Sequence, residues 1–140
     1  MVIDTSAVIA ILTNEPERQS FNEAVDKATS RMMSAASFVE ASIVIEGSRG
    51  YDGLRDFDLF VASAGIEIVP VDIEQALIAR EAYRRYGKGR HSAALNYGDC
   101  FSYALAKATG LPLLFKGNDF SGTDIQPHLR SGRPSKSTLP

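Results

Sequence analysis

Four acidic residues of this chain could do chemistry together. They are Asp4, Glu40, Asp99 and Asp119. Each can be placed where a strand ends or where the next helix begins, and parallel strands of an open α/β sheet present their carboxyl ends at one ligand-binding edge. Four carboxylates at that edge would form a site for a hard divalent cation, because such ions prefer oxygen ligands.

Electrostatics requires a counter-charge if these acids converge. Two carboxylates about 5 Å apart repel each other by roughly 3 kcal/mol at an effective dielectric constant near 20. The whole stability of a domain is only about 5–15 kcal/mol, so four such groups need a cation or bound protons. The chain has one Cys and two His, which cannot supply the usual zinc ligands. The pattern therefore favours Mg²⁺, with Mn²⁺ as a substitute.

Two of the acids also have a purely structural interpretation as helix caps. Asp4 could cap the helix that follows the first strand, although Thr5 or Ser6 could do so and leave Asp4 free. Glu40 completes an S-x-x-E capping box that starts at Ser37. A helix that follows the second strand would still begin at the same sheet edge as Asp4, which supports the metal interpretation.

The other two acids have local alternatives as well. Asp99 would complement the dipole of the helix that it opens, and Gly98 before it would allow a ligand to approach the backbone closely. Asp119 could serve only a turn. Asp72 also follows a strand, but a D-x-x-Q capping box with Gln75 accounts for it, so we leave it out of the site.

Short apolar runs alternate with amphipathic segments along the chain. Strands are predicted at residues 2–4, 31–35, 66–71 and 111–115, and helices at residues 5–12, 16–28, 37–47, 54–64, 72–86 and 98–109. A break is expected at 50–53 and a loop or short helix at 87–97. This order predicts one α/β domain, a three-layer α/β/α sandwich around a mostly parallel sheet of four to five strands. We expect the domain to span residues 1–127 and residues 128–140 to form a disordered tail.

The composition limits the functional classes. The chain has 140 residues, a hydrophobic fraction of 44% and a net charge of −2, so overall basicity gives no reason to expect nucleic-acid binding. The N-terminus shows no signal-peptide pattern, and no apolar run is long enough to span a membrane. The single cysteine suits a reducing compartment, and we expect a cytoplasmic protein.

The assembled motifs resemble those of PIN-domain ribonucleases of the VapC toxin type. The matching segments are MVIDTSA (1–7), ASFVE (36–40), LNYGDCFSYA (95–104) and LLFKGNDF (113–120). The resemblance implies a metal-dependent endoribonuclease whose acidic quartet is the four acids above. It implies Asp4 and Asp99 as direct Mg²⁺ ligands, with Glu40 and Asp119 as further candidates. Supporting roles would fall to Thr5, Ser6 and Asn96.

A basic stretch before Asp99 could bind the RNA. It contains Arg84, Arg85, Lys88 and Arg90, and Lys116 stands close to Asp119 in sequence. The alternative interpretation is a solvated helix end whose cations complement the helix dipole. Tyr83, Tyr86 and Tyr97 lie among these charges and could stack on unpaired bases of tRNA or rRNA loops.

The expected reaction is hydrolysis of RNA by metal-activated water, with Glu40 or Asp119 taking the proton. The resemblance implies a VapB-type antitoxin as partner, and the apolar helical patterns between Phe21 and Val61 suggest a surface for the antitoxin or a second toxin copy. We expect a homodimer or a toxin–antitoxin hetero-oligomer and no membrane association. Two alternatives remain open: a PIN-like nuclease for RNA processing or DNA flaps without an antitoxin, and a phosphate-accepting receiver domain.

Overall fold

A computed structural model describes residues 1–128. Four strands and five helices alternate in the described residues. They are β1 (Val2–Ile3), α1 (Thr5–Leu12), α2 (Arg18–Lys27), β2 (Met32–Ser34), α3 (Ala35–Ser63), β3 (Glu67–Val69), α4 (Ile73–Tyr86), α5 (Asp99–Thr109) and β4 (Leu113–Leu114). The tail predicted at 128–140 lies, apart from His128, outside the described residues.

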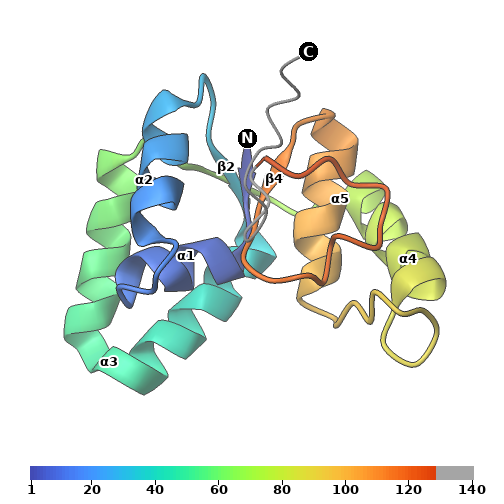
Figure 1. The fold of residues 1–140 in the computed structure, drawn as a ribbon, viewed down its shortest axis with the longest axis horizontal. Coiled ribbons are helices and arrows are strands. Elements are labelled where there is room, and N and C mark those ends of the chain that lie inside the picture. Colours follow the sequence, from blue (N-terminus) through green and yellow to red (C-terminus); the bar gives the residue numbers. More distant parts are fainter. Residues whose placement is uncertain (129–140) are drawn as a thin grey trace, which may run out of the picture.

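The strands form one parallel sheet in the order β3-β2-β1-β4. Helices α1, α2 and α3 cover one face of the sheet, and α4 and α5 cover the other (Figure 1). Successive side chains of a strand point to opposite faces, and Val2 and Ile3 accordingly belong to two separate apolar cores. The predicted three-layer sandwich is confirmed, with four strands in its sheet.

The two cores are well filled with large apolar side chains. Phe21, Phe57 and Met33 are fully buried on the α1–α3 side. Leu105 and Phe120 are fully buried on the α4–α5 side. The sheet between them is therefore a rigid platform for the loops at its ends.

Most predicted elements are present, but the strands are shorter than predicted and several helix boundaries differ. The helix predicted from Ser37 begins at Ala35, and Ser34 is its N-cap, accepting a hydrogen bond from the Ala36 amide. The break predicted at 50–53 is a sharp bend inside α3 at Gly50, whose φ of 64° suits glycine. The helix predicted from Pro16 begins at Arg18.

Three helices begin at the same edge of the sheet. In Figure 1, the strands run downward, and α1, α3 and α5 all start on the side of their lower, carboxyl ends. Because α1 follows β1 after one residue and α3 follows β2 directly, their first turns are fixed to the sheet. This edge is where the predicted site should lie.

The outer side of β4 is paired with the end of the described chain. The Leu113 amide donates to the Gln126 carbonyl at 3.0 Å, and the His128 amide donates to the Leu113 carbonyl at 2.9 Å. Leu113 and Pro127 form a parallel bridge. The segment therefore covers one edge of the sheet.

No described helix is long and apolar enough to cross a membrane.

Candidate active site

Asp4 is the most enclosed of the four acids, with only 3% of its surface exposed. It is itself the N-cap of α1, so the prediction that Thr5 or Ser6 would cap this helix is wrong. Its Oδ2 accepts from the Ser6 amide at 3.0 Å and from the Ser6 hydroxyl at 2.6 Å. Its Oδ1 accepts from the Ser102 hydroxyl at 2.5 Å.

Ser6 links Asp4 to the loop that follows β4. Its Oγ accepts a hydrogen bond from the Lys116 amide at 2.9 Å, which leaves its own proton for Asp4. Thr5 instead donates to the Ser37 carbonyl at 3.2 Å. Ser6 is thus in contact with a predicted metal ligand, whereas Thr5 ties α1 to α3.

Asp99 opens α5 and is held by a reciprocal pair of hydrogen bonds with Asn96. Its amide donates to Asn96 Oδ1 at 2.9 Å, and its Oδ2 accepts from the Asn96 amide at 3.0 Å. The hydrogen-bond pattern is that of a capping box, although it lies just before the helix, whose N-cap is Gly98. It fixes one carboxylate oxygen and leaves the other directed away from the capping contacts. Asn96 therefore contacts Asp99 directly, and its orienting role stays a prediction.

Glu40 lies half-buried on α3, directly against Gly98. A Cβ atom placed on Gly98 would come within 1.9 Å of Glu40 Oε2, so the lack of a side chain at Gly98 makes room for this carboxylate. The capping-box interpretation of Glu40 is wrong, because Ser37 lies inside α3 and its hydroxyl contacts Ser102. Glu40 therefore does not cap α3.

Asp119 lies exposed in the loop after β4. Its link to the other acids is electrostatic. Desolvation by burial raises the pKa of Asp99 to about 7; the Asn96 backbone hydrogen bond opposes the rise, and the charges of Asp4, Asp119 and Glu40 add to it. All four predicted acids therefore act on the same small region.

The four carboxylates are suitable ligands for a hard divalent cation, although they do not lie within coordination distance of one point. Within residues 1–128, no group of three or more His, Cys, Asp or Glu side chains is close enough to hold a metal ion as it stands. The chemistry nevertheless fits, because the acids supply only oxygen ligands. Burial and the charges of the other three acids raise the pKa of Asp99, and a bound cation would offset those charges.

The predicted RNA-binding residues fall into two groups. Arg85 lies over the Tyr86 ring and Arg90 over the Tyr83 ring, at 5.0 and 5.9 Å from the ring centroids. Arg84 makes only an exposed ion pair at 3.5 Å with Glu81. These cations, with Lys88, lie at the end of α4 and in the following loop, which leads to Asp99 (Figure 1).

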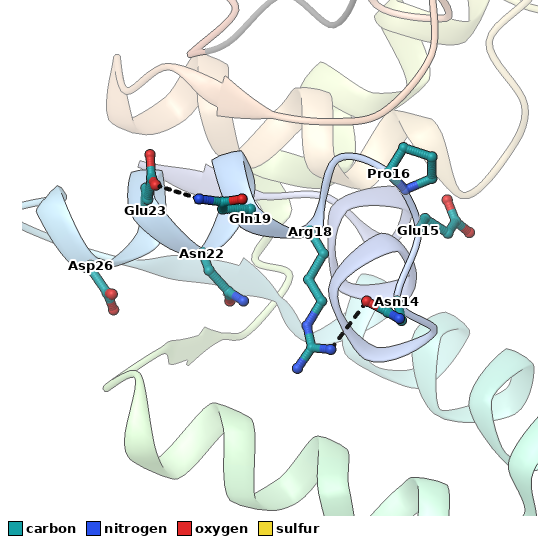
Figure 2. Close-up of a pocket in the computed structure, with 8 residues that line it drawn as sticks. All are labelled: Asn14, Glu15, Pro16, Arg18, Gln19, Asn22, Glu23 and Asp26. Carbon is teal, nitrogen blue, oxygen red and sulfur yellow. Dashed lines mark hydrogen bonds between the residues drawn. The ribbon is translucent and has the colours of Figure 1, made fainter.

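Lys116 is already engaged elsewhere. Its ammonium pairs with Glu15, and with Glu17 at 3.4 Å. Glu15 belongs to the turn between α1 and α2, where Figure 2 shows a polar pocket whose lining includes none of the predicted site residues. The charge of Lys116 is therefore largely balanced within the protein.

Sequence reasoning missed two buried hydroxyls behind the acids. Ser102 and Ser37 are 0% and 1% exposed, and their Oγ atoms lie 3.1 Å apart. Their positions gave a signal that could have been used: each is three residues from a predicted acid, and residues three apart share a helix face.

Comparison with known proteins identifies the family. The PIN domain family matches residues 1–126 of this chain. The chain belongs to the PIN domain family. A curated relative, ribonuclease VapC of Mycolicibacterium smegmatis, is 58% identical over 125 residues, which cover 89% of this chain and 97% of the relative. This match confirms the predicted resemblance to VapC-type ribonucleases, and the receiver-type alternative is abandoned.

Solved structures share the fold at low sequence identity. VapC20 of Mycobacterium tuberculosis, described as a sarcin–ricin loop cleaving toxin, has a TM-score of 0.73 at 16% identity and covers 89% of this chain and 95% of that one. A toxin–antitoxin complex from Klebsiella pneumoniae has a TM-score of 0.66 at 18% identity, covering 88% and 92%. At these identities the likeness supports the fold.

Proposed function

We propose that this protein is a metal-dependent endoribonuclease and the toxin of a type II toxin–antitoxin system. The observation that carries the proposal is the group of four acids, in which the charges of the other three all act on Asp99. The similarity to a curated VapC ribonuclease over nearly the whole of both chains supports the choice of RNA as substrate. Residues 1–127 form the nuclease domain.

Asp4 and Asp99 hold the cation, which is Mg²⁺, and Mn²⁺ substitutes for it. When bound, the cation supplies an activated water and offsets the charge that develops on the phosphate oxygens. The hydrogen bonds from Ser6 and Asn96 keep one oxygen of each carboxylate in a fixed direction. Glu40 or Asp119 takes the proton from the attacking water, because both are acids of the same cluster.

The arginines near the end of α4 bind the RNA backbone. Arg84 and Arg90 are exposed and close in sequence to Asp99, so a strand held there passes the acids. Tyr97 is 78% exposed and offers a ring on which an unpaired base can stack. The substrate is therefore a single-stranded or loop segment of tRNA or rRNA, and the protein acts in the cytoplasm where such RNA is found.

A VapB-type antitoxin covers the exposed apolar face of α3. Val39, Ile43, Val44 and Leu59 are 45–67% exposed, and all four lie on this helix. Apolar side chains gathered on one exposed element are typical of a protein interface. The toxin then forms a hetero-oligomer with its antitoxin, or a homodimer through the same kind of contact.

Cleavage of a defined RNA with and without Mg²⁺ tests the enzymatic part. Wild type should cleave only with the metal, and Asp4→Asn and Asp99→Asn should remove activity. Asp72→Asn is the matched control, because Asp72 also follows a strand but caps α4 through the Gln75 amide at 2.8 Å. Full activity in chelator, or in either site variant, would refute the mechanism.

Co-expression tests the toxin part separately. Expression alone should arrest growth, and expression with the neighbouring small reading frame should relieve the arrest. Ile43→Lys should prevent that relief while leaving RNA cleavage intact. If the variant and the neighbouring protein still co-purify as wild type does, α3 is not the antitoxin surface.

A further inference from the structure

A chain of buried hydroxyls leads from α3 through α5 to Asp4. Ser37 on α3 contacts Ser102 on α5, and Ser102 donates to Asp4 Oδ1. All three residues are at least 97% buried. These hydrogen bonds thus join the end of β1 to α3 and α5, two helices that are distant from each other in sequence.

The direction of each hydrogen bond follows from the chemistry of the groups. An ionised carboxylate only accepts hydrogen bonds, so the single hydroxyl proton of Ser102 belongs to Asp4. Ser102 can then only accept from Ser37, which must be the donor of that pair. The hydroxyls form a one-way series that ends on the carboxylate.

The same two serines also lie one helical turn from two other acids. Ser37 precedes Glu40 by three residues on α3, and Ser102 follows Asp99 by three residues on α5. Residues at this spacing share a helix face. The contact between the two hydroxyls therefore fixes how the turns that carry Glu40 and Asp99 approach each other.

We propose that Ser102, supported by Ser37, is a positioning residue that sets the orientation of Asp4 for the cation. The inference rests on the proposed metal-dependent function. Ser102 satisfies the buried Oδ1, while Ser6 satisfies Oδ2. A carboxylate has about four acceptor directions, and three are used by these donors. The remaining direction is held ready for the metal. Groups that hydrogen-bond to metal ligands in this way typically change metal affinity 10–100-fold when removed.

Calorimetric titration of the full chain with Mn²⁺, without RNA, tests this role. Ser102→Ala should weaken Mn²⁺ binding by about 10–100-fold, and Ser37→Ala should weaken it by a smaller factor. Ser102→Thr, which keeps the hydroxyl, should bind Mn²⁺ more tightly than Ser102→Ala. Ser42→Ala is the matched control on α3, because Ser42 donates only to the Phe38 carbonyl at 2.7 Å, and its Mn²⁺ affinity should equal that of wild type.

The outcomes separate this inference from the proposed function. If wild type binds Mn²⁺ and folded Ser102→Ala binds it as tightly, the positioning role is refuted and the nuclease proposal stands. If wild type binds no Mn²⁺, both are refuted. Should Ser102→Ala fail to fold, Ser37→Ala decides: weakened binding supports the role, and unchanged binding refutes it.

Discussion

Two carboxylates lie against helix α5, Asp99 at its first residue and Asp124 beside its later turns. Burial and the charges of the other acids raise the pKa of Asp99 to about 7. Partial burial also disfavours ionisation of Asp124, but hydrogen bonds from Lys107 and Tyr103 outweigh it and lower its pKa. Asp99 on α5 thus lies among like charges, whereas the charge of Asp124, in the loop beside the same helix, is balanced by Lys107.

The difference supports the functional role proposed for Asp99 and a structural role for Asp124. Lys107 pairs with Asp124 at 2.5 Å and Tyr103 donates to it at 2.6 Å, so this acid joins the final loop to α5. Asp99 has like charges around it instead. A carboxylate whose pKa is strongly raised by burial and like charges marks a candidate functional site, and the variants below test that distinction.

The largest effect is expected from removing the charge of Asp99. Asp99→Asn should lower RNA cleavage at saturating Mg²⁺ by about 100-fold or more, because a ligand that stabilises transition-state charge contributes several kcal/mol. Asp124→Asn should cleave at nearly the wild-type rate. Initial rates with one RNA measure both. Equal losses in the two variants would remove the contrast between the acids.

The same substitution should stabilise the metal-free protein. The folded-state pKa of Asp99 is raised, so the unfolded chain releases this proton first and stability falls as pH rises from about 4 to about 7. Asp99→Asn lacks this loss, so its free energy of unfolding at pH 8 should exceed that of wild type by up to about 4 kcal/mol. The difference should vanish near pH 4. Urea unfolding in chelator measures it, and a pH-independent difference would contradict the prediction.

An intermediate loss of RNA cleavage is expected from substituting Gly98. Gly98→Ala should displace the Glu40 carboxylate, which lies where the new Cβ must go, and lower cleavage about tenfold, a loss of about 1.4 kcal/mol. The fold should persist, because the displaced atoms end a flexible side chain. Gly47→Ala is the control, since a Cβ there meets nothing within 4 Å. Wild-type activity in Gly98→Ala would argue against a role for Glu40.

The smallest effect is expected from Asp124→Asn on stability. The variant should lose about 1 kcal/mol at pH 7, since its ion pair with Lys107 is partly exposed and one hydrogen bond is affected. The folded-state pKa of Asp124 is lowered, so the difference from wild type should shrink as pH falls below about 4. Urea unfolding at both pH values measures it. A constant difference would show that charge is not the cause.

The acids could be found from sequence because strand ends and helix starts leave local signals. Apolar runs before Asp4 and Asp119, and a glycine before Asp99, placed these residues without any contact information. The start of α3 was harder: both Ser34 and Ser37 are good N-cap residues, and only packing against α5 decides between them. The capping-box interpretation of Glu40 failed for that reason.

The serines behind Asp4 leave a weaker signal in the sequence, which is only their spacing of three residues from an acid. Ser102 stands 98 residues from Asp4 in the chain, and a small residue in a helix is typical of close packing. Its role depends on which helix faces which strand end, which is a tertiary property. The same holds for Lys116, whose partners Glu15 and Glu17 lie about a hundred residues away.

The pairing of β4 with residues 126–128 limits how this protein can assemble. Backbone groups on that side are already satisfied, and the opposite border offers only the three residues of β3 before Pro70. A partner strand could therefore form few backbone hydrogen bonds with either border of the sheet. Removing the residues after Ile125 would uncover the amide and carbonyl of Leu113 and invite strand exchange between copies.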